Sequence, residues 1–461
     1  TVYDNVVGRH NRYFYLENTG TIELNGTKDL LANITTPGFG AGTGTYVSNS
    51  GTININGSEA KGVYLKSLPV GTTSAGTYFD FVNPIALTGD KSIGMVFERN
   101  DLNFTLSAIN FNIGFSGNNA SSTGNSMTNA DLVENAIGLY TNQSTFTVTS
   151  GDGSTPYQLG LTNILLGKNS SGSMLFRSDG GVITVNGVAK IDKGSNNIGL
   201  VASNSLVPST GKVILSSSGV LNILGGTDAI GTIINNSNNS GAYAQNGGIV
   251  ENNGLINASG MGTNGIVSGF GTSAGNIINN AVVDKSNNGA AVVLAGGNFT
   301  NNATGIIVTR NGSAGVYSDV TAAPVINGGT LISTLLGTPY TAYQAAYGTK
   351  TTGIIADNGG IAYYSGVNSS TLSTGNITIS GANTTIMNGG LMFYNNYAVG
   401  GGAGTYGQFT ISPGSSIKVE DGGTIFNFDG TPAGGGLFTY TAADFTSYMT
   451  DTFSGSIGNL Q

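Results

Sequence analysis

The fold is decided by a phrase near the start of the chain, Asn18-Thr19-Gly20-Thr21-Ile22-Glu23-Leu24-Asn25-Gly26, which returns as Asn49-Ser50-Gly51-Thr52-Ile53-Asn54-Ile55-Asn56-Gly57 and, more loosely, at 178–187. In the second copy Ile53 and Ile55 point to one face of a strand, and Asn54 points to the other. Asn and Gly at both ends supply the positive φ angles that a tight corner requires. Each copy therefore predicts a short strand between two turns.

A second phrase, in which glycine stands within or just before a run of two to four apolar residues, recurs along most of the chain. It occurs at 61–65, 92–97, 136–140, 197–201, 240–244, 264–267, 288–292, 314–317 and 352–355. Between Gly241, Gly265, Gly289 and Gly315 the steps are 24, 24 and 26 residues. A period in the twenties that holds two or three short strands is typical of one coil of a parallel β-solenoid.

We therefore expect an all-β fold, a right-handed parallel β-helix with inserted side loops. A single coil cannot bury its own inward face, but coils stacked about 4.8 Å apart pair their strands and build a continuous aliphatic core. The alternative is a set of antiparallel sandwiches, which also have short strands and Gly-rich turns. Their strands seldom repeat one turn phrase at a steady interval, and their edges usually carry more Lys and Glu.

The composition narrows the class of protein. The 461 residues include 75 Gly and 9% charged residues, yet 39% are hydrophobic and only 9 are Pro, which disfavours both disorder and collagen. Without cysteine, no disulfide or thiolate metal site can form. The net charge of −8 argues against a nucleic-acid partner, and no apolar run reaches the roughly 18 residues that a membrane-spanning helix needs.

The repeat also predicts the organisation of the chain. We expect an N-terminal cap or edge at 1–17, a parallel β-helix at 18–430, and a C-terminal cap or continuation at 431–461. Four stretches interrupt the period, near 67–91, 108–134, 151–162 and 319–352. Because binding residues concentrate in loops on a rigid scaffold, these stretches are the predicted partner-binding regions.

Aromatic residues in three of these stretches are the candidate contacts. One group lies at 340–347, where tyrosines at i, i+3 and i+7 are compatible with one face of a short helix. The alternative is that these rings pack against the side of the β-helix. The full set of candidates is Tyr340, Tyr343, Tyr347, Tyr78, Phe79, Phe81 and Tyr157.

No catalytic, cofactor-binding or metal-binding residue is predicted. His10 is the single histidine, and Gly271-Thr272-Ser273-Ala274-Gly275 matches the nucleophile-elbow pattern without a predicted strand-to-helix turn. Glycoside hydrolysis needs convergent carboxylates, whereas the acids here are scattered and Glu420-Asp421 would project to opposite faces of a strand. A non-catalytic binding protein is therefore the favoured interpretation. A polysaccharide-active enzyme and a passive spacer remain the alternatives.

Both phrases, together with 252–257 and 298–305, resemble passenger repeats of type V autotransporters, above all those of the very large outer-membrane autotransporter adhesins of fusobacteria. The resemblance covers most of 20–430 and implies export to the bacterial surface, either secreted or anchored by a separate C-terminal β-barrel. It also implies binding without turnover, to a host-cell receptor protein or glycan or to another bacterium, with self-association as a further possibility.

Overall fold

The computed structural model describes 2–4, 13–34, 44–65, 77–81, 83–98, 103–106, 111–114, 132–142, 144–149, 157–159, 169–192, 194–204, 211–224, 238–269, 275–302, 304–318, 325–327, 354–356, 359–365, 377–380, 383–386, 389–396, 409–411, 416–419 and 422–429. Within these ranges all regular secondary structure is β-strand. The chain forms two compact units, which are described separately. The first comprises Thr1–Ala242 with Gly247–Val250, and the second comprises Tyr243–Asn246 with Glu251–Gln461.

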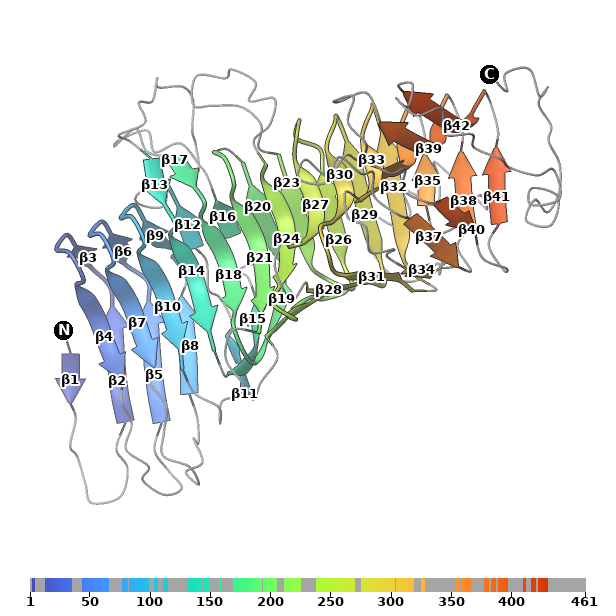
Figure 1. The fold of residues 1–461 in the computed structure, drawn as a ribbon. Helices are drawn as coiled ribbons and strands as arrows, with labels where there is room; N and C mark the ends of the chain where they lie inside the picture. The colour runs from blue at the N-terminus through green and yellow to red at the C-terminus, as the bar shows by residue number, and fades with distance from the viewer. Residues whose placement is uncertain are drawn as a thin grey trace. The chain divides into compact units, whose positions relative to one another are not determined.

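The first unit is built from parallel strands that stack coil upon coil and form three sides around a common core (Figure 1). Its first sheet contains β3 (Thr21–Leu24), β6 (Thr52–Ile55), β9 (Ile85–Leu87), β12 (Phe111–Ile113), β16 (Tyr157–Leu159), β20 (Val188–Ile191) and β23 (Val220–Ile223). Its second sheet contains β4 (Leu30–Ile34), β7 (Lys61–Leu65), β10 (Ile93–Phe97), β14 (Ile137–Thr141), β18 (Met174–Ser178) and β21 (Ile198–Ser203).

The third side of this unit is divided between two sheets. One contains β2 (Tyr13–Asn18), β5 (Gly44–Asn49) and β8 (Thr77–Phe81), with β1 (Val2–Asp4) antiparallel to β2. The other contains β11 (Asn103–Leu106), β15 (Thr145–Thr149), β19 (Val182–Asn186) and β22 (Lys212–Leu215). A short pair, β13 (Leu132–Glu134) and β17 (Asn169–Ser171), stands beside the main sheets.

The second unit repeats the arrangement. Its first sheet contains β26 (Leu255–Ala258), β29 (Val282–Ser286), β32 (Ile306–Arg310), β35 (Ile354–Ala356), β38 (Asn383–Ile386) and β41 (Ser416–Val419). Its second sheet contains β27 (Asn264–Ser268), β30 (Ala290–Leu294), β33 (Ala314–Ser318), β36 (Ile361–Ser365), β39 (Leu391–Asn396) and β42 (Thr424–Asp429). The remaining side contains β28 (Asn276–Asn279) with β31 (Asn298–Asn301), and β34 (Val325–Asn327) with β37 (Ile377–Ser380) and β40 (Phe409–Ile411).

In both units the chain visits the three sides in a fixed order, so that each coil adds one strand to each side. The parallel β-solenoid predicted from the sequence is confirmed. The first phrase also stacks as predicted, because Ile53 pairs with Ile22 and Ile55 pairs with Leu24. The looser copy at 178–187 does not belong to this stack, since its strand β19 pairs with β15 and β22 on another side.

Asparagine side chains join successive coils at the corner that precedes the first sheet. In the first unit Asn18 Nδ2 donates to Asn49 Oδ1 at 2.7 Å. In the second unit Asn252 Nδ2 donates to Asn279 Oδ1, and Asn279 Nδ2 donates to Asn301 Oδ1, both at 2.7 Å. A buried amide without a partner would cost free energy, and the ladder satisfies each one with its counterpart in the next coil.

Glycine in the second phrase is required by the close stacking of coils. A Cβ on Gly62 would lie 2.4 Å from the carbonyl oxygen of Gly94, and one on Gly94 would lie 2.6 Å from that of Gly138. These distances are too short for any side chain. The periodic positions differ from the prediction in one place, because Gly265 lies against Ala291 in the next coil and not against Gly289.

The predicted interruptions are partly wrong. Strands of the solenoid lie inside all four of them, namely β8 and β9 in 67–91, β12 and β13 in 108–134, β16 in 151–162, and β34 in 319–352. These strands lack the two phrases but contribute apolar inward residues such as Ile85 and Phe111, which are fully buried. The helix expected around 340–347 and the predicted C-terminal segment 431–461 lie outside the described residues.

Candidate functional site

Phe81 was a predicted partner contact, and that prediction is wrong. Its side chain is fully buried at the end of β8. It pairs with Asn49, so it takes the next position in the stack begun by Asn18 and Asn49. The stack of asparagine side chains ends here, since Asn49 Nδ2 donates to the backbone carbonyl of Asn83 at 3.3 Å. The buried ring of Phe81 cannot reach a partner on the surface.

Tyr157 was also a predicted contact, and its burial contradicts that prediction too. Its ring lies edge-on to Phe176, with 4.9 Å between the centroids, and Phe176 contacts Phe111 at 6.3 Å. Burial raises the pKa of the Tyr157 phenol, whose hydroxyl has no hydrogen-bond partner among the described residues. The three rings form part of the core of the first unit.

The other candidates stay predictions. Tyr78 and Phe79 lie in β8, in register with Tyr46 and Val47, and their side chains are outside the described part of the chain. The tyrosines at 340, 343 and 347 are also outside it, as are His10, Ser273 and the acidic pair Glu420-Asp421.

The structure brings together a set of residues that the sequence reading did not single out. On the outward face of the second sheet in the first unit, Tyr64, Val96, Tyr140 and Arg177 are consecutive partners across β7, β10, β14 and β18. We call these four residues the first column. The tyrosines are half-buried, whereas their inward neighbours Val63 and Leu139 are fully buried, as the two-residue period of a strand requires.

Tyr64 is fixed in the first column by a carboxylate. Its hydroxyl donates to Glu98 Oε2 at 2.5 Å, and the Lys61 ammonium lies 5.5 Å from the centre of its ring. Burial and the hydrogen bond to Glu98 raise the pKa of Tyr64 to about 12. The phenol therefore stays protonated at neutral pH and continues to donate.

Tyr140 and Arg177 share a second carboxylate. Arg177 donates to Asp179 through Nε and Nη2, both at 3.0 Å, in a two-pronged pair that fixes the guanidinium plane. Burial and the nearby charge of Asp179 raise the pKa of Tyr140 to about 12, although Arg177 acts in the opposite direction. Between the two tyrosines, Val96 is only 3% exposed.

The second unit has its own outward column on its second sheet, formed by Val293, Tyr317 and Tyr364 in consecutive strands. We call these three residues the second column. The rings of Tyr317 and Tyr364 lie 5.2 Å apart between centroids and are tilted by 36°. In this column tyrosine contacts tyrosine, as in an aromatic packing pair.

The first column offers flat aromatic surface beside a fixed cation and fixed carboxylates. Tyrosine and arginine are the residue types most enriched at interfaces, because a rigid amphipathic ring loses little conformational entropy on binding and guanidinium presents several donors. The described residues contain no group of three or more His, Asp or Glu that could hold a metal ion. This surface therefore offers aromatic faces and charged groups for contact.

Among the described residues, no helix is long and apolar enough to cross a membrane. Comparison of the chain with protein-family models, curated proteins and solved structures finds no match.

Proposed function

We propose that this chain is a surface-exposed, non-catalytic binding segment of a bacterial adhesin. The passenger-like repeats suggest the setting, at the cell surface or secreted. The observation that carries the proposal is the first column, in which Tyr64 and Tyr140 are held on the outward face by Glu98 and Asp179. Aromatic rings fixed by charged neighbours are pre-organised for contact, so little ordering cost opposes binding.

The partner is a protein or a glycan on a host cell or on another bacterium. A protein would place apolar or aromatic side chains on the rings, and its carboxylates or carbonyls would accept from Arg177. A glycan would lay an apolar face on a ring and would use its hydroxyls at Arg177, Glu98 and Asp179. In either case the coil supplies a rigid support, because each strand is bonded on both sides.

Adhesion of coated beads tests this proposal. Beads carrying the chain are counted on human cells, on partner bacteria and on one another, with and without simple sugars or free amino acids as competitors. Beads coated with an unrelated acidic protein provide the background. We expect selective binding that one class of competitor reduces, with no release of reducing sugar from polysaccharides.

Three outcomes would contradict the proposal. Binding to no surface above background would favour a passive spacer, which holds a distal binding region away from the cell. Steady release of reducing sugar would favour the polysaccharide-active enzyme. Binding of beads only to one another would assign self-association in place of a foreign partner.

A further inference from the structure

A lysine lies in the core of the second unit, in an inward column of the first sheet. The side chain of Lys285 is fully buried. It pairs with Ala258 in the preceding coil and with Thr309 in the next, and Thr309 pairs with Ala356. These small neighbours leave room for the long side chain, so the site is built around it.

The amine of Lys285 is satisfied by backbone carbonyls. Nζ donates to the carbonyl oxygen of Gly260 at 3.1 Å and to that of Ser286. The structure gives it no ion pair within the described residues. Both acceptors are neutral, so they satisfy the hydrogen-bonding capacity of the amine without balancing a positive charge.

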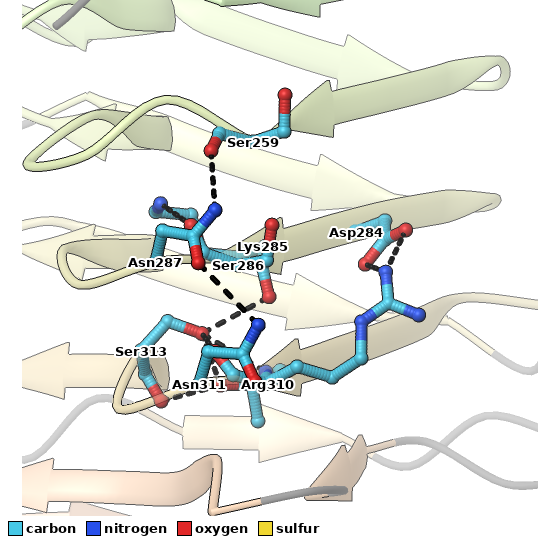
Figure 2. Close-up of polar contacts among 9 residues, drawn as sticks. Ser259, Asp284, Lys285, Ser286, Asn287, Arg310, Asn311 and Ser313 are labelled. Carbon is cyan, nitrogen blue, oxygen red and sulfur yellow. Dashed lines mark hydrogen bonds and ion pairs between the residues drawn. The ribbon is translucent and has the colours of Figure 1, made fainter.

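The nearest carboxylate is engaged elsewhere. Asp284 lies on the opposite face of β29, where both of its oxygens accept from Arg310 Nη2 (Figure 2). Asp284 and Arg310 are the only charged residues of the described elements that pack against Lys285, which are β26, β27, β29, β30, β32 and the turns 259–263 and 287–289. The other side chains of these elements are neutral, either apolar or polar.

A ladder of polar groups closes the corner at Lys285. Asn287 Nδ2 donates to the carbonyl oxygen of Ser259 at 3.0 Å, and Asn311 Nδ2 donates to Asn287 Oδ1 at 3.4 Å (Figure 2). Ser313 Oγ donates to the carbonyl oxygen of Lys285 at 3.0 Å. The two asparagine bonds are exposed and the Ser313 bond is buried, and all three join one coil to the next. Opening of the corner therefore breaks this small set of bonds and admits water to the amine.

We propose that Lys285 makes the coils from β26 to β33 a proton-sensitive part of the second unit, which opens more readily as the pH falls. In the closed coil, burial lowers the pKa of Lys285 from 10.5 to about 7. Opening hydrates the amine and restores its ordinary pKa. Between these two values the open state binds one more proton, so the equilibrium constant for opening rises by about tenfold for each unit of pH lost. Below pH 7 the amine is protonated in both states, so the equilibrium constant for opening no longer changes with pH.

Hydrogen exchange of the whole chain, followed by mass spectrometry from pH 6 to 9.5 and corrected for intrinsic exchange rates, tests this proposal. For peptides within 255–302 we expect an opening constant that rises about tenfold per unit between pH 9.5 and 7.5 and levels off below 7. Peptides within 182–203 of the first unit are the internal reference and should show no such rise.

Lys285→Met should remove the slope and lower the opening constant at pH 7. Lys190→Met is the matched control, because Lys190 occupies an outward position in β20 and pairs with Asp192 at 3.5 Å. It should leave the 255–302 profile unchanged. An unchanged slope in Lys285→Met would overturn the proposal. If that variant does not fold, a wild-type profile at 255–302 that matches 182–203 would overturn it equally.

Discussion

In the first unit, the inward column of the first sheet that ends each strand is aliphatic throughout, with Leu24, Ile55, Leu87, Ile113, Leu159, Ile191 and Ile223 in register. In the second unit, the corresponding column begins Ala258, Lys285, Thr309 and Ala356 before it returns to Ile386 and Val419. The strands of the two units are arranged alike, but the side chains at this inward position differ. Because each coil contacts only its neighbouring coils, a change in one coil is tolerated when the adjacent coils compensate.

The outward columns of the two units also differ, in the groups that their tyrosines contact. In the first unit the tyrosines bond to carboxylates and lie near cations, whereas in the second unit Tyr317 and Tyr364 contact each other. The first unit therefore combines an aliphatic core with a polar and aromatic surface. The second unit has a core that includes a buried amine, and an outward column in which aromatic packing dominates.

The largest expected effect comes from moving the lysine into the first unit. Ile191→Lys would put an amine between Leu159 and Ile223, both fully buried and too large to make room. The cost combines lost packing with a buried charge, and we expect about 5 kcal/mol or more. Soluble yield and denaturant unfolding measure it. Thr184→Lys, at a half-exposed position of β19, is the control and should change stability by less than about 1 kcal/mol.

A smaller effect distinguishes the two asparagine ladders. Asn279→Ala removes the side-chain acceptor of Asn252 and the side-chain donor to Asn301, so we expect a loss of about 3 kcal/mol in denaturant unfolding. Asn49→Ala removes the side-chain acceptor of a single asparagine, Asn18, and should cost about 2 kcal/mol. Asn302→Ala removes a bond in an exposed ladder and should cost under about 1 kcal/mol. Equal losses at all three positions would mean that burial of the ladder is unimportant.

The smallest effect has opposite signs in the two units. Tyr157→Phe removes a buried hydroxyl that has no partner among the described residues, and should stabilise the first unit by about 1 kcal/mol. Tyr363→Phe removes a hydroxyl that lies 2.8 Å from Thr384 Oγ1, and should destabilise the second unit by a similar amount. Thermal unfolding of the two variants measures both shifts, and shifts of the same sign would contradict this assignment.

The coil could be predicted from the sequence because its determinants recur in short phrases along the chain. Alternation in 52–55 marks a strand within one coil, whereas the corner asparagines and the glycine of the second phrase contact the next coil, as the close backbone contacts at Gly62 and Gly94 show. The looser copy at 178–187 was misplaced because an apolar strand flanked by Asn and Gly has the same pattern on any of the three sides.

The surface was harder to predict. Tyr64 and Tyr140 are 76 residues apart in the sequence, and coils of unequal length separate them, so the column is visible only once the register is known. A signal was present, because tyrosine stands two residues after glycine in Gly62-Val63-Tyr64, Gly138-Leu139-Tyr140 and Gly315-Val316-Tyr317. Lys285 had no such signal, since a charged residue in a strand is ordinarily assigned to the outward face.

The central claim, that the first column contacts the partner, is tested most directly by bead adhesion of column variants to whichever surface binds the wild type. Valine is the replacement of choice, because Val96 and Val293 already occupy these columns. Ile214→Ser, a half-exposed position on another side of the first unit, is the control. We predict that Tyr64→Val with Tyr140→Val reduces adhesion at least tenfold, while Tyr317→Val with Tyr364→Val and the control adhere as the wild type does. Undiminished adhesion of the first pair would contradict the claim, and loss confined to the second pair would move the binding surface to the second unit.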